Sequence, residues 1–488
     1  MSLTLRDPTL LKSQAFLGGQ WVSADHGATF PVTNPANGEV VGHVPSLGVA
    51  ETRRAIEHAD AARGAWRAKT ARDRAAILRR WFDLMLQNAD DLGAIMTAEQ
   101  GKPLGEARGE VLYGAAFLEW FAEEGKRVYG DTIPSQSADR RILVTKEPIG
   151  VCAAITPWNF PSAMIARKAA PALAAGCPMI VKPAEQTPLS ALAMAALAER
   201  AGVPAGVLQV VTADLEHTPA VGLELTTHPL VRKVTFTGST EVGRILMRQS
   251  ASTVKKLSLE LGGNAPFIVF EDADLDAAVE GAMVSKYRNA GQTCVCANRL
   301  FVHTRIYDAF AERLAVAVRR LRVGAGTEAG ITTGPLIDRA ALEKVEGHVA
   351  DAEAKGATAL VGGRRHGLGG TFYEPTVLTG VTPDMRLFRE EIFGPVAPLF
   401  RFETDAEVVA MANDTEYGLA AYFFSRDVGR CFRVAEALEY GMVCINTGML
   451  STEVAPFGGV KQSGFGREGS KYGIDEYLSL KYVCLGGI

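Results

Sequence analysis

The chain has 488 residues, which is enough for about two to four domains with a sizeable core. Lys and Arg number 51 and Asp and Glu 55, so the net charge is −4, and no run of like charges indicates a surface for nucleic acid or membrane. Charged residues within the first 20 interrupt the apolar stretch of a secretory signal. We therefore expect a cytoplasmic protein that acts on small molecules, with no nucleic acid and no membrane among its partners.

The first third of the chain is predicted to be mainly helical, because apolar residues recur at helical spacing between residues 49 and 127. Residues 131–146 instead alternate polar and apolar positions, and residues 477–485 are β-prone. Exposed edge strands of this kind often pair with another subunit. Both segments are therefore candidates for subunit contacts.

From residue 148 onwards, short apolar runs alternate with helical segments, which predicts parallel, doubly wound sheets. The first group of predicted strands comprises residues 151–156, 178–181, 207–211 and 234–237. The second group comprises residues 267–270, 300–303, 358–361, 420–425 and 442–446. The fold class is therefore α/β, with two α/β domains.

Two glycine-rich segments are candidates for a phosphate site. Residues 464–469 fit GxGxxG as a string, but no apolar strand precedes them and too few residues follow for a βαβ unit, so we predict a glycine-rich loop. At Gly238 and Ser239 a β-branched strand runs into an amphipathic helix, where exposed amides could hold a pyrophosphate. An ordinary capped turn would have the same sequence.

Lys182 and Glu185 follow another predicted strand, at the edge where open α/β sheets bind ligands. The lysine suits a ribose or phosphate, and the carboxylate can accept both ribose hydroxyls. Glu185 would also repel a 2′-phosphate, which favours NAD over NADP as cofactor. A solvated ion pair on a loop is the alternative.

Seven cysteines make a disulfide framework improbable and direct attention to one reactive thiol. Cys294 lies in a loop of small residues, where a substrate has room to reach a nucleophile. A buried structural cysteine is the alternative, whereas a metal site lacks further Cys or His ligands, so no metal is expected. Cys296 is expected to pack inertly, with an oxidative disulfide to Cys294 as the other possibility. The remaining five cysteines lie in apolar runs and are predicted to be core residues.

A nucleophilic thiol needs a base, and the eight histidines stand in no recognisable motif, which disfavours a cysteine hydrolase. Glu260 lies among leucines at the end of a predicted strand and is followed by two glycines. Burial there would raise the pKa of its carboxyl into the range of a general base. An exposed residue on a half-buried strand is the alternative.

Several short motifs together carry a family resemblance, in order from about residue 16 to the C-terminus. They are FLGGQW at 16–21, TPWNF at 156–160, KPAE at 182–185, FTGS at 236–239, ELGG at 260–263, GQTC at 291–294, EIFGP at 391–395 and PFGG at 456–459. The chain resembles the NAD(P)-dependent aldehyde dehydrogenases.

The resemblance implies a Rossmann-like cofactor domain, an α/β catalytic domain and a small β oligomerisation arm. We expect residues 1–130 and 150–258 to form the dinucleotide-binding domain and residues 259–465 the catalytic domain. Residues 131–149 and 466–488 would form the arm of a homo-oligomer, either a dimer or a tetramer.

By motif position, Cys294 would attack the aldehyde, and Asn159 with the Cys294 backbone N–H would hold the oxyanion. Glu260 would activate the water that hydrolyses the thioester, and Lys168 and Glu468 could pass a proton outward. The residues implied to bind NAD or NADP are Thr156, Trp158, Lys182, Glu185, Gly238, Ser239, Glu391 and Phe393.

Within this superfamily the chain is most similar to the succinate-semialdehyde dehydrogenases, through residues 164–168, 288–296 and 464–473. Arg167 and Arg288 offer guanidinium forks for an ω-carboxylate, with Ser451 as a third donor. Phe160 and Phe457 are expected to line the same substrate pocket. Structural ion pairs are the alternative for both arginines.

Two departures from this subfamily bear on specificity. Tyr287 stands where Phe is common, and Glu185 stands where NADP-preferring members often carry a small residue. The first leaves glutarate semialdehyde, one methylene longer, as an alternative substrate. A cysteine hydrolase, an inactive structural protein and an acyl-CoA-forming enzyme are the more distant alternatives, and the last two are disfavoured because Glu260 is present beside Cys294 and Asn159.

Overall fold

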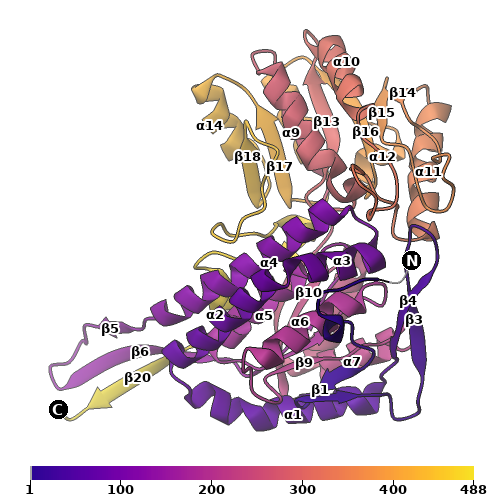
Figure 1. Cartoon of the computed structure of the whole chain (residues 1–488). Coiled ribbons are helices and arrows are strands. Elements are labelled where there is room, and N and C mark those ends of the chain that lie inside the picture. The colour runs from indigo at the N-terminus through magenta and orange to yellow at the C-terminus, as the bar shows by residue number, and fades with distance from the viewer. Residues whose placement is uncertain (1–2) are drawn as a thin grey trace.

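The computed structural model of the chain describes residues 3–488. Two lobes, each built on its own sheet, lie one above the other, and a narrow β arm projects from the lower lobe (Figure 1). The chain enters the upper lobe only after residue 260 and returns to the lower lobe near residue 464. The active-site candidates therefore come from segments far apart in the sequence.

Five parallel strands form the centre of the lower sheet, in the order β9-β8-β7-β10-β11. Their bounds are Val151–Ile155 (β7), Met179–Lys182 (β8), Leu208–Val210 (β9), Val231–Thr237 (β10) and Lys256–Glu260 (β11). The order reverses between β7 and β10, as in dinucleotide-binding sheets, and ligands bind beyond the carboxyl ends at such a point. The predicted strands 151–156, 178–181, 207–211 and 234–237 are confirmed, within a few residues at their ends.

The edges of the lower sheet are antiparallel and were not predicted. Strands β1 (Ala15–Leu17) and β2 (Gln20–Val22) extend it beyond β9, and the two-residue strand β19 (Gly464–Phe465) pairs with β11. A loop was expected at β19; the backbone of Gly464, at φ 104°, instead lies so close to Leu259 that a Cβ there would be 1.9 Å from the Leu259 carbonyl oxygen. A separate hairpin is formed by β3 (Thr29–Thr33) and β4 (Val40–Pro45).

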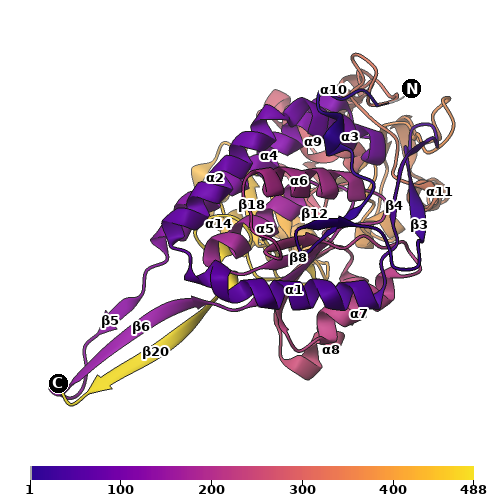
Figure 2. The same ribbon diagram turned by 60° about the horizontal axis from the view of Figure 1, so that its bottom comes forward.

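Helices cover both faces of the lower sheet. On one face lie α1 (Val49–Ala68), α7 (Thr218–Thr227) and α8 (Thr240–Ser250); on the other lie α2 (Ala71–Gln87), α3 (Ala89–Gln100), α4 (Leu104–Glu124), α5 (Ala163–Ala175) and α6 (Pro188–Arg200) (Figure 2). Alternate residues of β7 belong to two separate apolar clusters, Val151 and Ala153 to one, Cys152 and Ala154 to the other. This alternation is the signature of a strand buried on both sides. The helical prediction for residues 49–127 is confirmed.

The upper sheet has seven strands in the order β14-β15-β16-β13-β12-β17-β18, and all neighbours except β14 and β15 are parallel. Its strands are Ala265–Val269 (β12), Ala297–His303 (β13), Thr358–Val361 (β14), Thr376–Thr379 (β15), Val396–Phe402 (β16), Ala420–Phe424 (β17) and Met442–Ile445 (β18). Its helices are Leu275–Tyr287 (α9), Tyr307–Val318 (α10), Arg339–Ala354 (α11), Arg386–Arg389 (α12), Asp405–Asn413 (α13) and Val428–Ala437 (α14). The predicted strands are confirmed, and β15 and β16 are additions.

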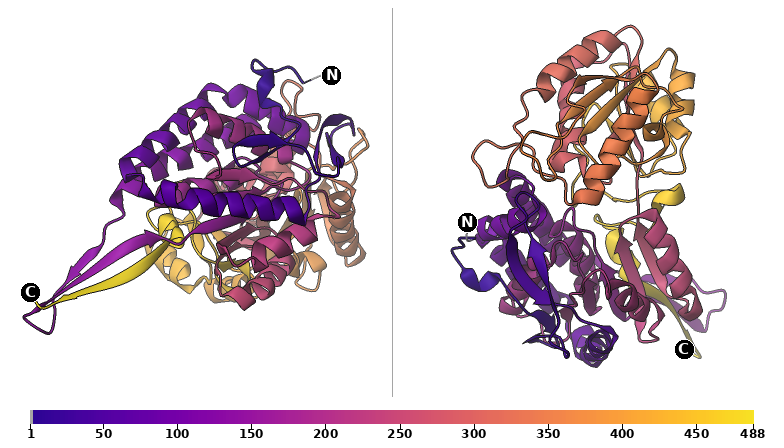
Figure 3. Two further views of the ribbon diagram at one scale, coloured as in Figure 1. Left: turned by 90° about the horizontal axis from the view of Figure 1, so that it is seen from below. Right: turned by 90° about the vertical axis from the view of Figure 1, so that its right-hand side faces the viewer.

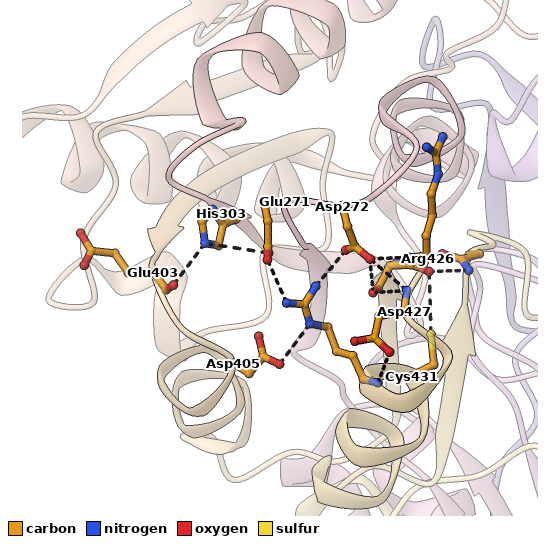
Figure 4. A network of polar contacts seen from close by, with 11 residues as sticks. Glu271, Asp272, His303, Glu403, Asp405, Arg426, Asp427 and Cys431 are labelled. Carbon is orange, nitrogen blue, oxygen red and sulfur yellow. Dashed lines mark hydrogen bonds and ion pairs between the residues drawn. The ribbon is translucent and has the colours of Figure 1, made fainter.

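An ion-pair network closes the carboxyl edge of the upper sheet (Figure 4). The guanidinium of Arg430 binds Glu271 and Asp272 at 2.9 Å each and Asp405 at 3.0 Å. Asp272 also accepts backbone N–H groups of Arg426 and Asp427, at 2.8 and 2.9 Å. The residues that follow β12 and β17 are thereby tied together.

The arm is a three-stranded antiparallel sheet that stands away from both lobes (Figure 3). It consists of β5 (Asp131–Ile133), β6 (Arg140–Pro148) and β20 (Leu478–Gly486), and β20 pairs with β6 from Leu478 opposite Pro148 to Gly486 opposite Arg140. Residues 466–477 lie outside this sheet, because the turn Gly473–Tyr477 packs against α5. The arm strand therefore begins later than residue 466.

The cysteines differ in their surroundings. Cys152 and Cys177 are buried as predicted, but Cys431 and Cys444 are only half-buried and Cys484 on β20 is exposed. The core prediction is therefore wrong for Cys484, because both faces of the projecting arm meet solvent. Within residues 3–488, no helix is long and apolar enough to cross a membrane.

Candidate active site

The candidate site lies where the carboxyl ends of β7 and β10 face the Cys294 loop of the upper lobe. A cavity of about 260 Å³ opens there. Its lining includes seven predicted residues, namely Trp158, Asn159, Gly238, Ser239, Cys294, Glu391 and Phe393. The two lobes thus bring together motifs that are separated by more than 200 residues in the sequence.

The loop that carries the thiol has an unusual backbone. Asn289, Ala290 and Gly291 adopt φ values of 51°, 53° and 75°, three left-handed residues in succession, which for the two non-glycine residues is strained. A Cβ at Gly291 would lie 2.2 Å from the Gly394 carbonyl oxygen. Glycine is therefore required where this loop crosses the segment that carries Glu391.

Asn289 fixes this loop to the lower lobe through buried hydrogen bonds. Its side-chain amide donates to the Asn159 carbonyl at 3.0 Å and accepts from Gln100 Nε2 at 3.0 Å. Its backbone N–H donates to Glu106 at 2.8 Å. These bonds offset the backbone strain and hold Cys294 opposite Asn159.

The half-buried Cys294 lies on the wall of the cavity. Burial raises the pKa of its thiol to about 12, against the opposing positive charges of Arg167 and Arg288. At neutral pH the Cys294 thiol is therefore protonated, and it must lose its proton before it can act as a nucleophile.

Asn159 is buried beside the thiol loop. Its Nδ2 donates one hydrogen to the Gln292 carbonyl at 3.0 Å, which leaves the second N–H of the same amide for another acceptor. Its Oδ1 is buried without a partner.

Glu260 ends β11, and only 2% of the residue is exposed. Neither carboxyl oxygen has a hydrogen-bond partner. Burial, assisted by the negative charge of Glu468, raises its pKa well above the ordinary value, and Arg167 and Lys168 partly oppose this. The burial and raised pKa expected of a general base are both present.

Glu468 forms a buried cluster with two cations of α5. It accepts hydrogen bonds from Arg167 Nε and Lys168 Nζ, and Lys168 also donates to Thr237 Oγ1 at 2.6 Å. Although burial raises the pKa of Glu468, these two positive charges bring it below the ordinary value. Arg167 thus forms the structural ion pair that was the alternative to substrate binding, but its Nη2 is buried without a partner.

Arg288 has hydrogen-bond contacts but no ion pair with another residue among those that the structure describes. Its two Nη atoms lie 3.3 Å from Ser451 Oγ, and its guanidinium stands over the Phe160 ring at 5.3 Å. Arg167 stands over the Phe457 ring at 4.0 Å. The predicted substrate residues thus form two cation–aromatic pairs, and both guanidinium charges act on the Cys294 thiol.

Ser239, Glu391 and Phe393 line the cavity, whereas the predicted substrate residues lie outside its lining. Ser239 caps α8, where its hydroxyl accepts from the Val242 N–H at 3.2 Å. Glu391 accepts from the Gly263 N–H at 3.2 Å, and burial raises its pKa to about 7. Phe393 meets Trp158 edge to face, with ring centroids 5.6 Å apart.

Lys182 and Glu185 lie one strand away from the Cys294 cavity, beyond the end of β8. Their charged groups form a 3.5 Å ion pair. Lys182 is buried and its pKa is lowered by that burial, whereas Glu185 is half-exposed. The hydroxyl of the buried Thr156, at the end of β7, has no partner.

Two residues near the site were not predicted. Lys344 of α11 lines the cavity, and the buried hydroxyl of Tyr113 on α4 lies in the field of Arg167 and Arg288. Both residues lie in amphipathic helices. From the sequence alone, Lys344 has the pattern of a surface residue and Tyr113 that of a packing residue.

Comparison with known proteins agrees with this geometry. Residues 21–483 match the aldehyde dehydrogenase family. The chain is 65% identical to the glutarate-semialdehyde dehydrogenase of Pseudomonas aeruginosa, over 100% of both chains. It is 62% identical to the succinate-semialdehyde dehydrogenase [NADP(+)] GabD of Escherichia coli, over 99% of this chain and 100% of the relative.

A solved structure matches equally well. The crystal structure of succinate-semialdehyde dehydrogenase from Burkholderia pseudomallei is 68% identical, with a TM-score of 0.98 over 99% of this chain and 100% of that one. The predicted fold and enzyme class are thereby confirmed, and the chain belongs to the aldehyde dehydrogenase family.

Proposed function

We propose that this aldehyde dehydrogenase oxidises an aldehyde with a distal carboxylate, succinate semialdehyde in the first place, to the dicarboxylate with NAD or NADP. The observation that carries the proposal is the pair of guanidinium groups, Arg167 and Arg288, whose charges act on the Cys294 thiol. Arg167 Nη2 is buried without a partner. A buried cation with an unused donor fits an anionic group of the substrate.

The relatives support the same class of substrate, since their names specify succinate or glutarate semialdehyde. Both compounds carry a carboxylate at the end opposite the aldehyde. One methylene changes discrimination by only about 1–3 kcal/mol. Glutarate semialdehyde therefore remains the alternative substrate.

In the first step, the Cys294 thiol loses its proton to solvent water, and Sγ forms a bond to the aldehyde carbon. The carbonyl electron pair moves to oxygen, and the resulting oxyanion accepts from the Asn159 side-chain amide and the Cys294 backbone N–H. Bound NAD or NADP supplies the acceptor for the hydride that then leaves the carbon. The thiohemiacetal thereby becomes a thioester on Cys294.

In the second step, Glu260 accepts a proton from water, whose oxygen attacks the thioester carbon. The C–S bond breaks, the sulfur leaves as a thiolate, and the carboxylic acid is released. Because its carboxylate oxygens have no other partner, Glu260 is free to accept that proton. Lys168 and Glu468, which are hydrogen-bonded to each other, are the proposed route of the proton outward.

The residues present fit a dinucleotide. The capped N-terminus of α8 at Ser239 offers amides to a pyrophosphate, and Glu391 lies on the cavity wall as an acceptor for ribose hydroxyls. The unpartnered Thr156 hydroxyl, Gly238, Trp158 and Phe393 complete this side. We propose that Lys182 and Glu185 bind the second ribose, where the Glu185 carboxylate favours NAD, although one relative is named for NADP.

We also propose the predicted division into a cofactor domain, a catalytic domain and an oligomerisation arm. The two main sheets and the projecting arm support it. Strand β20 lies at the edge of the arm sheet and exposes Leu480, Tyr482 and Leu485. Such an edge is suited to pairing with a second copy, in a dimer or a tetramer.

The test is a panel of kcat/KM values for succinate semialdehyde, glutarate semialdehyde, butanal and pentanal, each with NAD and with NADP. Wild type is expected to prefer the two semialdehydes. Arg288→Ala should reduce that preference about 10- to 100-fold, because hydrogen bonds to charged groups contribute about 1.5–3 kcal/mol. Arg313→Ala, at an exposed ion pair on α10, is the matched control. An unchanged preference in Arg288→Ala and Arg167→Lys together would refute the substrate assignment.

A further inference from the structure

The side chain of Tyr113 extends from α4 toward the proposed carboxylate pocket. The residue is half-buried, but its hydroxyl oxygen is fully buried and has no hydrogen-bond partner. A buried hydroxyl without a partner costs about 1–3 kcal/mol, so such groups are rare unless something occupies the position when the protein works.

The surroundings of Tyr113 are those of the two substrate arginines. Its ring packs on the small cluster of Phe160, Ala163 and Met164, and the Phe160 ring is covered by Arg288. A T-shaped contact with Phe117, at 5.0 Å between centroids, fixes the ring. Gly114, the next residue, lets α4 approach α5 closely, since a Cβ there would lie 3.2 Å from the Ala163 Cα.

Two donors come together near the start of α5. Arg167 Nη2 and the Tyr113 hydroxyl are both buried, neither has a partner at ordinary hydrogen-bond distance, and the hydroxyl hydrogen is left without an acceptor. Burial raises the pKa of Tyr113, and the positive charges of Arg167 and Arg288, together with hydrogen bonding toward Arg167, oppose that rise, so the Tyr113 hydroxyl oxygen faces the Arg167 guanidinium. Arg167 cannot turn away, because its Nε is bound to Glu468 and its plane stacks on Phe457.

We propose that the Tyr113 hydroxyl donates a hydrogen bond to the ω-carboxylate of the substrate, beside Arg167 and Arg288, and is a specificity-determining residue of the enzyme. This inference rests on the proposed function. A carboxylate has about four acceptor sites, so one oxygen can accept from a guanidinium while the other accepts from a neutral hydroxyl. The bound anion would satisfy both orphaned donors at once, whereas a neutral aldehyde would leave them unpaired.

The experiment compares Tyr113→Phe with wild type, using semialdehydes and neutral aldehydes of equal length. KM for succinate and glutarate semialdehyde should rise about 10- to 100-fold, because hydrogen bonds to charged groups contribute about 1.5–3 kcal/mol. The kcat with these substrates, and kcat/KM for butanal and pentanal, should change less than about threefold. Inhibition of pentanal oxidation by succinate should weaken by the same factor as KM, which measures anion binding without its turnover.

Thermal unfolding distinguishes this role from a structural one. Replacing an unpartnered buried hydroxyl by hydrogen should leave Tm unchanged or raise it. A lowered Tm together with an equal loss of activity on all four aldehydes would indicate a packing role and overturn the proposal. Tyr129→Phe, which removes a hydroxyl from a residue that is 72% exposed, is the matched control and should change neither quantity.

The outcomes for the two proposals are separable. If wild type prefers semialdehydes and Tyr113→Phe retains both that preference and the wild-type KM, only the assignment of Tyr113 fails. If wild type itself does not distinguish pentanal from glutarate semialdehyde, the proposed substrate class fails, and the role of Tyr113 fails with it.

Discussion

The two large sheets differ in the hydrogen bonding of the polar groups at their carboxyl edges. At the edge of the lower sheet, beyond β7, β10 and β11, polar groups are left without partners: Thr156 Oγ1, Asn159 Oδ1 and both oxygens of Glu260. Burial also raises the pKa of Glu260 well above its ordinary value. These groups are costly to bury and are kept uncompensated where a ligand is expected.

At the carboxyl edge of the upper sheet, Glu271, Asp272 and Asp405 are all paired with Arg430 (Figure 4). Although partial burial raises the pKa of Glu271 and Asp272, hydrogen bonds from Arg430, Ser425 and neighbouring backbone bring both below their ordinary values. The thiol lies on the opposite, amino-terminal side of this sheet, in the loop before β13. The two carboxyl edges therefore differ in their hydrogen bonding. Polar groups without partners mark the edge proposed to bind ligands, and paired charges mark the edge that stabilises the fold.

We expect the Cys294 thiol to be needed for aldehyde oxidation but not for the stability of the fold. Cys294→Ser should lower aldehyde oxidation at least about a thousandfold, because the hydroxyl is a far weaker nucleophile here. Tm should stay within about 2 °C of wild type. NADH production and calorimetry measure the two effects, and Cys484→Ser on the exposed arm strand is the control.

A substitution of Glu260 tests the role of a buried carboxyl that has no hydrogen-bond partner. Glu260→Gln should lower steady-state kcat about 100- to 1,000-fold but retain a first-turnover burst of NADH, since the thioester forms before water attacks. Tm should change little, because a buried carboxyl without a partner is replaced by a carboxamide of the same size. Loss of the burst, or a marked loss of stability with no loss of kcat, would contradict the assignment. Glu439→Gln, at an exposed ion pair, is the control.

Substitutions in the ion-pair network of the upper sheet should lower stability and leave activity unchanged. Arg430→Met is expected to lower the free energy of unfolding by about 1–3 kcal/mol, less than for a fully buried pair because its partners are partly exposed. Its kcat/KM should stay within about twofold of wild type. Urea unfolding beside steady-state kinetics tests this, with the more exposed Arg426→Met expected to cost less than about 0.5 kcal/mol. A fall in activity at unchanged stability would assign this network to function.

The smallest expected effect concerns pH and the cofactor. Because burial raises the pKa of Glu391 to about 7, its carboxyl is mostly protonated at pH 6 and ionised at pH 8. Only the ionised form accepts both ribose hydroxyls, so Kd for NAD should fall by up to about tenfold between these pH values. Titration calorimetry with Glu391→Gln should remove this dependence, and a Kd that rises with pH in wild type would contradict the role.

Sequence reasoning predicted most of the parallel strands of both sheets because buried parallel strands are continuous apolar runs. It missed β15 and β16 in the upper sheet, and it missed β1, β2 and β19, which are short antiparallel edges held by pairing rather than by their own composition. It also assigned Cys484 to the core, because an apolar residue on a projecting arm has the same pattern as one in a buried strand.

The site divides in a similar way. Cys294 and Glu260 could be proposed from the chemistry of their own segments, and Asn159 from the family resemblance. Tyr113 and Lys344 could not, because their roles depend on which helix face the tertiary fold presents to the cavity. A structural ion pair was one of the two alternatives for Arg167, but its partner Glu468 could not be predicted, as the two residues lie 301 positions apart.

Glu468 is synthesised about 300 residues after Arg167 and Lys168, the two cations that it pairs with. Its side chain neutralises Arg167 and Lys168 inside the lower lobe, and the strand that completes the arm follows soon after it in the chain. During synthesis, α5 leaves the ribosome some 300 residues before this partner. Until Glu468 has been made, neither of these two cations has its buried counter-charge. Completion of the Arg167–Lys168–Glu468 cluster therefore waits for the C-terminal segment of the chain.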